Sequence, residues 1–352
     1  MGIILAILLF SAIIIIHELG HFLLAKANGI RVDEFSLGLG PTLFGKQFGE
    51  TKFSVKLLPF GGSCMMLGEE EDIADDSSFS RKSVYARMAI IFAGPFFNFI
   101  LAFIFSVILT AVMGYQSPQI TVVADNTPAQ KSGLQVGDVV KEINGKTMTI
   151  DGDISLYTAY YGFPKGEDVT MVVERDGQEK TIVMKPELMK DASGNENYRI
   201  GINHGKWEKV GILGNLKYST YEMKYWIETV VKSLQGLVTK RFKASDVSGP
   251  VGIVSTMGKN IEASGDKDNG GGPGMMVMSM IYWCIMLSAN LGVMNLLPIP
   301  ALDGGRLLFL IIEWIRRKPM NPKYEGYVNM AGFMLLMLLM VVILGHDIIN
   351  LF

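Results

Sequence analysis

The segment IIIIHELGHF, residues 13–22, lies in an apolar run that begins at Gly2 and continues to Ala25. Four isoleucines stand directly before a cluster that contains two histidines and a glutamate, His17, His21 and Glu18. The run is long enough for a bilayer-spanning helix, which needs about 20 mainly apolar residues. Ionisable side chains inside a span cost free energy on insertion and are retained chiefly for function. The segment therefore predicts a membrane helix that carries a chemically active site.

A secretory signal peptide is the alternative for this segment, because Ala25-Lys26-Ala27 resembles a cleavage site. However, no lysine or arginine precedes Ile3, so the basic region that opens a signal peptide is missing. The apolar core of a signal peptide also does not require polar residues such as His17, Glu18 and His21. We therefore expect the segment to remain in the protein as its first span.

The composition favours a membrane protein, with 49% hydrophobic residues, 19% charged residues and a mean hydropathy of +0.31. Further apolar segments of near-spanning length lie at 88–113, at 275–297 with an interrupted continuation to 315, and at 328–346. The net charge of −2 gives no sign of a nucleic-acid partner. Two isolated cysteines do not form a disulfide framework. The fold class predicted is a polytopic α-helical membrane protein with four transmembrane helices.

Basic residues in short loops predict the orientation of the spans. The loops 26–87 and 316–323 are both rich in lysine and arginine, so we expect them on the cytoplasmic side. Both termini and the long region 114–274 then lie outside. That region also contains many lysines, but long translocated domains escape the rule.

Residues 115–205 predict a water-soluble domain in which short β-type runs alternate with turn signals such as Asn144-Gly145. These runs lie at 119–124, 139–143, 168–174 and 180–184. The stretch NTPAQKSGLQVGDVVKEINGK, residues 126–146, resembles the core signature of PDZ domains, which bind extended peptides at a sheet edge. We expect Ile200, Gly201 and Ile202 to form the peptide-binding loop. The alternative is a β-domain that only spaces the membrane parts, since a fold does not establish binding.

The region 206–274 is predicted to contain an amphipathic helix followed by a linker. Apolar residues recur at helical spacing over 215–242, but lysines interrupt every long run, which favours a helix on the membrane surface. The glycine-rich stretch 266–274 is typical of a flexible linker.

The spacing of His17 and His21 places both imidazoles on one helix face. HExxH is the zinc-binding motif of many metalloproteases, and its glutamate acts as the general base. A catalytic zinc has three protein ligands and leaves one position for water or substrate. The motif therefore predicts a zinc site in which Glu18 accepts a proton from the zinc-polarised water. A polar cluster that only joins helices is the alternative.

A third ligand must come from elsewhere, and the candidates near other spans are Asp303, Glu313, His346 and Asp347. His346 and Asp347 lie at the outer end of the fourth apolar segment, whereas the HExxH motif lies near the cytoplasmic end of the first. Glu313 precedes two arginines and resembles a boundary residue. Asp303 lies in NLLPIPALDGGR, residues 295–306, where two prolines break the helix. Because broken helices at membrane depth face protein or a watery cavity, the sequence favours Asp303.

Together these motifs resemble the site-2 protease family of intramembrane zinc metalloproteases. The resemblance rests on HExxH at 17–21, GPxxN at 94–98, SGPVGI from Ser248, NxxPxPxxDG at 295–304 and the PDZ-like stretch. It is nearest to the bacterial branch that cleaves anti-sigma factors and remnant signal peptides after an upstream site-1 type protease. Some members of that branch carry two PDZ domains in tandem, whereas this chain has room for one.

The resemblance implies one Zn²⁺ per chain held by His17, His21 and Asp303, with Glu18 as catalytic base. Asn295 would bind the substrate or stabilise the oxyanion, which requires fixed donors in a dry cavity. Asn98 would support the site or bind the substrate strand. For both asparagines the alternative is a hydrogen bond that only joins helices.

A cytoplasmic or re-entrant β region is expected at about residues 30–67. Within it the segment KFSVKLLPFGGSCMML, residues 52–67, is implied to form a membrane-associated β-hairpin beside the active site. There Phe60, Gly61 and Gly62 would contact an unwound substrate that adds a strand to the hairpin edge. An ordinary cytoplasmic hairpin is the alternative. The acidic run at 69–72 is expected to be a solvated loop.

The resemblance thus implies an endopeptidase of the bacterial cytoplasmic membrane that hydrolyses transmembrane segments of single-span proteins in regulated intramembrane proteolysis. The active site would face the cytoplasmic side, and an extracytoplasmic PDZ domain would be inserted between the second and third spans. A catalytically inactive membrane adaptor that presents a PDZ domain is the main alternative. A metal transporter is less favoured, because it would need several ligand clusters along a path.

Overall fold

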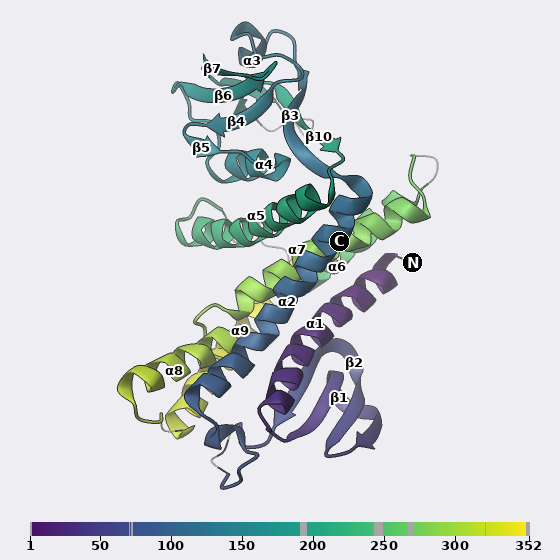
Figure 1. Ribbon diagram of the computed structural model, residues 1–352, viewed down its shortest axis with the longest axis vertical. Coiled ribbons are helices and arrows are strands. Elements are labelled where there is room, and N and C mark those ends of the chain that lie inside the picture. Colours follow the sequence, from purple (N-terminus) through teal and green to yellow (C-terminus); the bar gives the residue numbers. More distant parts are fainter. Residues whose placement is uncertain are drawn as a thin grey trace. The chain divides into compact units, whose positions relative to one another are not determined.

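The computed structural model describes residues 2–69, 71, 73–190, 196–242, 249–266, 270–320 and 322–349. The chain forms two compact units, which are described separately (Figure 1). Unit 1 combines Met1–Phe105 with Lys243–Phe352, and unit 2 is Ser106–Phe242.

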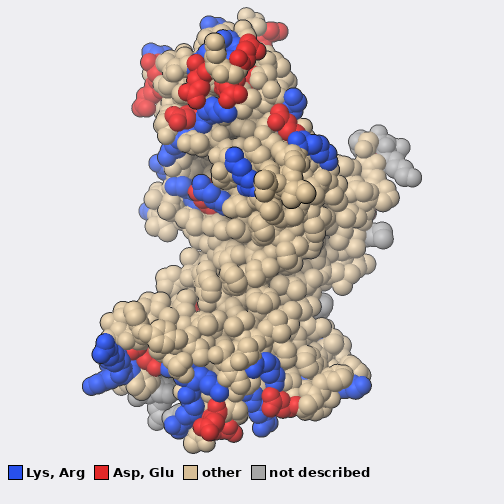
Figure 2. Space-filling model, viewed as in Figure 1, with Lys and Arg blue, Asp and Glu red and all other residues tan. Residues whose placement is uncertain are grey.

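Unit 1 consists mainly of helices. These are α1 (Gly2–Ala27), α2 (Val84–Met113), which continues into unit 2, α6 (Pro250–Gly265), α7 (Pro273–Asn295), α8 (Asp303–Arg316) and α9 (Pro322–Ile349). Four are long and apolar enough to cross a membrane, namely α1, α2, α7 and residues Tyr324–Ile343 of α9. The prediction of four membrane helices is therefore confirmed in length and composition. On the face shown in Figure 2, the helical part of unit 1 is largely free of charge, and charged side chains gather near the hairpin and the end of α8.

Glycines let the spans of unit 1 approach closely. A Cβ atom at Gly20 of α1 would lie 2.4 Å from the carbonyl oxygen of Ala93 in α2. A Cβ atom at Gly292 of α7 would lie 2.7 Å from the ring of Phe99 in α2. Small residues at helix interfaces allow such backbone approach where lipid supplies no hydrophobic driving force. These contacts bring α1 and α7 to α2, the helices that carry most of the predicted site residues.

Helix α6 lies between the predicted surface helix, 215–242, and the predicted linker, 266–274, in a stretch to which the sequence analysis assigned no element. The helix packs on the start of α1, and a Cβ atom at Gly2 would lie 2.1 Å from the carbonyl oxygen of Gly258. Met257 and Ile261 are fully buried in the same contact. Their four-residue spacing is the helical signal that could have identified the element.

The third apolar segment is interrupted, as its prolines predict. Helix α7 ends at Asn295 and α8 begins at Asp303. Proline lacks an amide hydrogen and clashes with the preceding turn, so it ends helices. The turn is tight, because a Cβ atom at Gly304 would lie 2.3 Å from the carbonyl oxygen of Leu296. The break places Asp303 in the first turn of a new helix.

Strands β1 (Val32–Phe48) and β2 (Thr51–Met66) form a hairpin between α1 and α2. Both strands lie within the expected β region 30–67, and the segment 52–67 pairs with a first strand that begins at Val32. Residues 32–37 pair with 62–66 on one side and with 52–55 on the other. Residues 62–66 therefore form an outer edge of this sheet among the described residues. Phe35, Cys64 and Met66 anchor the hairpin in an apolar cluster with Ile90 of α2.

Unit 2 contains a mixed α/β domain whose main sheet has the strand order β10-β3-β4-β6-β7. The strands are β3 (Tyr115–Val123), β4 (Val139–Ile143), β5 (Lys146–Thr147, paired with β4), β6 (Val169–Arg175), β7 (Gln178–Met184) and β10 (Ile202–Glu208). The four predicted strands are present with shifted ends, and β10 extends past the predicted limit at residue 205. The short helix α3 (Pro128–Lys131), helix α4 (Asp151–Tyr160) and the hairpin of β8 (Glu187–Lys190) and β9 (Glu196–Arg199) were not predicted.

Helix α5 (Ile212–Val238) follows the sheet, close to the predicted range 215–242. Its first turns contact the end of α2, because the amide of Asn215 donates to the carbonyl of Val107 at 3.2 Å. Val107 lies inside the candidate span Val84–Met113. Ile212 and Leu213 are 84% and 83% exposed, so the start of α5 presents apolar side chains beside the end of a span. This arrangement favours the predicted membrane-surface helix.

An ion pair lies between β4 and β6 of unit 2. The guanidinium of Arg175 donates to the Asp138 carboxylate at 2.6 and 2.7 Å, and the amide of Gln135 donates to it at 2.9 Å. Burial alone would raise the pKa of Asp138, but these hydrogen bonds outweigh it and hold the pKa below its usual value. The Asp138 side chain is 1% exposed, so its buried charge depends on these hydrogen-bond partners.

We predict that Arg175→Met lowers the unfolding free energy of unit 2 by about 3 kcal/mol, because it leaves a buried charge uncompensated. Hydrogen exchange of the β4 and β6 amides in the full-length chain measures this. The control Lys141→Met removes an exposed pair with Glu174 and should cost less than about 1 kcal/mol. Since the folded pKa of Asp138 is depressed, its contribution is complete above about pH 4 and is lost as the pH falls through the folded value. Equal effects of the two variants would contradict this account.

Candidate metal centre

Three side chains from distant parts of the sequence converge inside unit 1. The Nε2 atoms of His17 and His21 lie 3.3 Å apart. Oδ2 of Asp303 lies 3.1 Å from the first and 3.5 Å from the second. Both histidines are 6% exposed. This is the one group of potential metal ligands found among the described residues.

These separations match the ligand shell of a small tetrahedral cation. Ligand atoms that lie about 2.0–2.1 Å from zinc in a tetrahedron are separated from one another by roughly 3.3–3.4 Å. Without a cation, two imidazole nitrogens and a carboxylate oxygen would bring three electron-pair donors face to face. Oδ2 of Asp303 is also buried without a hydrogen-bond partner among the described residues. Nitrogen and oxygen donors of this kind suit Zn²⁺.

The orientation of His21 is set by α2. Its Nδ1 atom lies 2.9 Å from the carbonyl oxygen of Ile90, to which it donates. A neutral imidazole that donates from Nδ1 leaves the lone pair of Nε2 free for a metal. Pro95 lies one turn later in α2, which loosens the helix at this point.

The orientation of His17 is set by Asn98, a fully buried residue of α2. The amide of Asn98 lies 3.1 Å from Nδ1 of His17, and its oxygen has no partner among the described residues. Turning the amide by half a rotation would place this oxygen where it accepts a hydrogen from Nδ1. Nε2 would then be free to bind a metal. The structure therefore places Asn98 behind a candidate ligand, and its predicted contact with substrate stays a prediction.

Gly94 provides the space in which the two imidazoles meet. A Cβ atom at this position would lie 2.2 Å from Nε2 of His21 and 2.8 Å from Cε1 of His17. Any larger residue would displace a ring. The glycine of the GPxxN pattern is thus explained by contact with the histidines.

Glu18 and Asn295 lie beside the same centre. The amide of Asn295, at the end of α7, lies 3.4 Å from Nε2 of His17. Gly62 of β2 packs on Glu18, and a Cβ atom there would lie 3.0 Å from Cγ of the glutamate. The hairpin edge therefore runs past the residue that the motif assigns as the base.

The other predicted site residues lie elsewhere or outside the described part. Gly61 stands next to Gly62 in β2, and the side chain of Phe60 lies outside the described residues. The alternative ligand Glu313 is engaged by Arg87 instead. The side chains of His346 and Asp347 also lie outside the described residues.

The predicted peptide loop at Ile200, Gly201 and Ile202 belongs to unit 2. Ile200 is buried, Gly201 has a φ of 85°, and Ile202 begins β10.

Two ion pairs that the sequence did not reveal hold α8, the helix that begins with Asp303. Arg306, one turn after Asp303, pairs with Glu69 in the turn that follows β2. At the other end of the helix, Glu313 pairs with Arg87 of α2. The expectation of a solvated acidic loop was wrong for Glu69, whose side chain is 17% exposed. Glu70 and Asp72 lie outside the described residues.

Comparison with known proteins agrees with this geometry. A profile of peptidase family M50 matches residues 5–339. The chain belongs to peptidase family M50, the site-2 protease family. A protein of Clostridium acetobutylicum is 38% identical over 348 residues, which cover 99% of this chain and 97% of that protein.

Several of the similar proteins are named RasP. The zinc metalloprotease RasP of Geobacillus kaustophilus is 31% identical over 424 residues, covering 97% of this chain and 96% of the relative. The regulator of sigma-W protease RasP of Bacillus subtilis is 31% identical over 429 residues, covering 98% of both chains. These alignments are longer than the 352 residues of this chain, so both relatives contain segments that it lacks.

Family membership establishes the general activity. The M50 enzyme described here is a membrane-embedded zinc metalloprotease, and Zn²⁺ is its cofactor. The predictions of an enzyme, of its family and of its metal are confirmed.

We predict that Gly94→Ala lowers zinc affinity by at least about tenfold, because the added methyl group displaces an imidazole. Zinc per chain, measured by elemental analysis after dialysis against a weak chelator, reports the change. Gly326→Ala in α9 is the matched control, since no atom lies within 4 Å of the position its Cβ would take. Full zinc retention by Gly94→Ala would show that the ring positions do not determine binding.

Proposed function

We propose that the enzyme hydrolyses peptide bonds inside the transmembrane segments of single-span proteins, with zinc held by His17, His21 and Asp303. The observation that carries this proposal is the convergence of three ligand atoms beside Glu18, two of them from histidines of the candidate span Gly2–Ala27. A site at that depth favours substrates whose peptide bonds also lie in the bilayer.

Zinc, when bound, polarises the scissile carbonyl group and lowers the pKa of a water molecule toward about 7. Glu18 accepts the proton of the attacking water and delivers it to the leaving amine nitrogen. Its neighbour Gly62 leaves room for the side chain, because a Cβ atom there would lie 3.0 Å from Cγ of Glu18. Asp303 supplies a negative charge that neither histidine carries, so the ligand set offsets part of the charge of the metal.

Asn295 provides the donor for the negative charge that develops on the carbonyl oxygen. Its amide points at the centre from the end of α7, at the edge of the broken helix. A fixed donor in a dry site stabilises such a charge more than water does. Asn98 acts differently, as a positioning residue that holds the tautomer and orientation of His17.

The hairpin edge at residues 62–66 supplies the surface on which the substrate unwinds. A transmembrane helix satisfies its own backbone hydrogen bonds, and a water molecule cannot reach its peptide bonds. Pairing with an edge strand replaces those bonds while the chain extends. Gly61 and Gly62 keep this edge free of bulky side chains next to Glu18, and Phe60 precedes them on the same strand.

We assign the sheet of unit 2 as a single PDZ domain. Leu134, Val140 and Ile143 of the PDZ-like stretch contribute to its core, which supports this assignment. The carbonyl groups of Ile200 and Gly201 accept bonds from Ala129 and Ala124, each at 2.9 Å. These bonds fix the loop through its carbonyl oxygens. A peptide carboxylate accepts hydrogen bonds and therefore does not need those oxygens. An incoming peptide terminus would lie between β10 and α4.

The position of unit 2 in the chain favours a role as a filter, by which we mean a domain that excludes substrates with long extracytoplasmic parts. It is inserted between two spans, and we place it on the extracytoplasmic side, with both termini, of a bacterial cytoplasmic membrane. The active site then faces the cytoplasmic side, as the basic loops predict. Substrates shortened by an upstream protease, such as anti-sigma factors or remnant signal peptides, would pass this filter. The sigma-W name of the Bacillus subtilis relative is consistent with such substrates.

Zinc content and cleavage together test the catalytic assignment. We predict that His17→Ala and Asp303→Ala lose stoichiometric zinc. Glu18→Gln should keep zinc and lose cleavage of a membrane-spanning peptide by at least about 100-fold, the usual contribution of a general base. Unchanged zinc content in Asp303→Ala would remove it from the ligand set.

The same measurement separates the alternatives. An inactive adaptor would show equal, negligible cleavage in wild type and Glu18→Gln. A transporter would move zinc into proteoliposomes, whereas the described residues contain one ligand cluster and no second one along a path.

Removing the sheet domain tests the filter. We predict that replacing residues 115–208 with a short glycine-serine linker lets the enzyme cleave substrates with long extracytoplasmic domains, which the full chain refuses. Short substrates should be cleaved equally by both forms, which controls for damage to the membrane part. Continued refusal of long substrates, with short ones still cleaved, would leave the domain as a spacer.

A further inference from the structure

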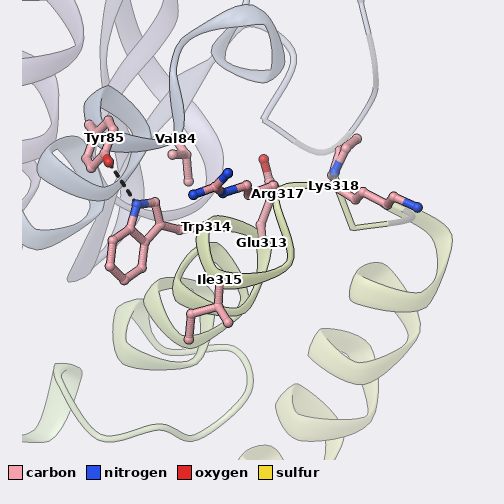
Figure 3. A pocket seen from close by; sticks show the side chains of 8 residues that line it. Val84, Tyr85, Glu313, Trp314, Ile315, Arg317 and Lys318 are labelled. Atoms are coloured by element: carbon pink, nitrogen blue, oxygen red, sulfur yellow. Dashed lines mark hydrogen bonds between the residues drawn. The ribbon is translucent and has the colours of Figure 1, made fainter.

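A cavity of about 720 Å³ lies between the start of α2 and the end of α8, at the opposite end of α8 from Asp303 (Figure 3). Its volume falls within the range of small-molecule sites. Val84, on its wall, is the first residue of the candidate span Val84–Met113. The cavity therefore opens where a span meets the interface with water, where lipid head groups surround the protein.

Two aromatic side chains on its wall are held together across the helices. Nε1 of Trp314 donates to the hydroxyl oxygen of Tyr85 at 2.8 Å. Because that oxygen accepts this bond, the hydroxyl hydrogen of Tyr85 is left for another acceptor, and none is found in the described part of the chain. Tyr85 is 64% exposed and Trp314 is 49% exposed. Amphipathic rings of this kind are enriched at membrane interfaces.

Arg317 adds a charge to the same wall. Figure 3 shows its guanidinium group directed toward Val84 and the Trp314–Tyr85 pair, whereas the Lys318 ammonium group points away. No carboxylate among the described residues forms an ion pair with Arg317. Glu313 also lines the cavity, but Arg87 already neutralises it. The cavity thus presents a net positive charge and a free hydroxyl hydrogen.

The backbone at Arg317 is in the left-handed region, with φ of 53° and ψ of 28°. Helices commonly end on a residue in this conformation, and glycine is the usual choice because a Cβ atom disfavours it. The chain carries an arginine there instead. A side chain kept in a disfavoured conformation beside a cavity is an observation that points to function.

We propose that this cavity binds the head group of an anionic phospholipid, with the phosphate contacted by Arg317 and Tyr85. A planar guanidinium group matches phosphate oxygens in a paired geometry. Basic pockets between membrane helices bind anionic head groups in this way. Exposed Ile315, together with Val84, offers apolar surface to the acyl chains.

Native mass spectrometry of the detergent-solubilised full chain tests the proposal with phosphatidylglycerol and phosphatidylcholine of identical acyl chains. The wild type should bind phosphatidylglycerol about tenfold more tightly, because both lipids carry the phosphate but only phosphatidylcholine brings a cation close to Arg317, and the repulsion of two like charges near a protein surface is large enough for such a difference. Arg317→Gly should lose this preference while its thermal unfolding midpoint stays equal or rises, because glycine favours the left-handed backbone. Arg317→Gln provides a second variant that keeps a side chain and lacks the charge.

Lys318→Gln is the matched control. It removes the same charge at the neighbouring residue, which also lines the cavity but whose ammonium group points away from the Trp314–Tyr85 pair. It should keep the preference within about twofold, as expected for a solvated surface charge. Equal loss from the Lys318 and Arg317 variants would overturn the site in favour of diffuse surface charge. Equal binding of the two lipids by the wild type would also overturn it. Displacement of the lipid by millimolar inorganic phosphate would show a phosphate site without lipid recognition.

Discussion

The burial of three polar ligand atoms inside unit 1 is the constraint on which the site depends. Two imidazole nitrogens and a carboxylate oxygen lie within 3.5 Å of one another in a buried position, where a bound cation satisfies their lone pairs. Polar groups in an apolar surrounding must be paired or must bind a metal. The rest of the site follows from this requirement. A glycine makes room for the rings, a backbone carbonyl and an amide orient them, and a broken helix delivers the carboxylate.

The sequence predicted that His17, His21 and Asp303 lie together, because the signals for these residues are local and chemical. His17 and His21 are related by helical spacing alone, and the prolines around Asp303 mark the broken helix without knowledge of its partners. The four spans follow from length and hydropathy, which the bilayer makes unusually informative. The contacts that orient the histidines were harder to predict from the sequence. Asn98 could be chosen as polar within a span, but whether it faces substrate or His17 depends on how α2 packs against α1.

The details that the sequence analysis missed depend on pairing over long distances. The sequence predicts a β region at 30–67, but the bounds of β1 follow from its pairing, because two parts of β2 flank residues 32–37. Helix α6 has a helical pattern, but the contact that packs it on α1 joins Gly2 and Gly258, which are far apart in the sequence. Glu69 lies in an acidic run that is typical of solvent, yet Arg306 pairs with it. Charge pairs of this kind leave no local signature in one sequence.

The proposed ligands stand at positions 17, 21 and 303, and the sheet domain is inserted between them. A metal held by these residues acts as a cross-link that joins the first and last parts of the chain around a long loop. Closing a loop costs conformational entropy that grows only slowly with its length, so an insertion as large as unit 2 is tolerated at little thermodynamic expense. The metal would therefore also have a structural role, because it would cross-link two distant parts of the chain. An inserted domain of a different size would leave the ring that the metal closes unchanged.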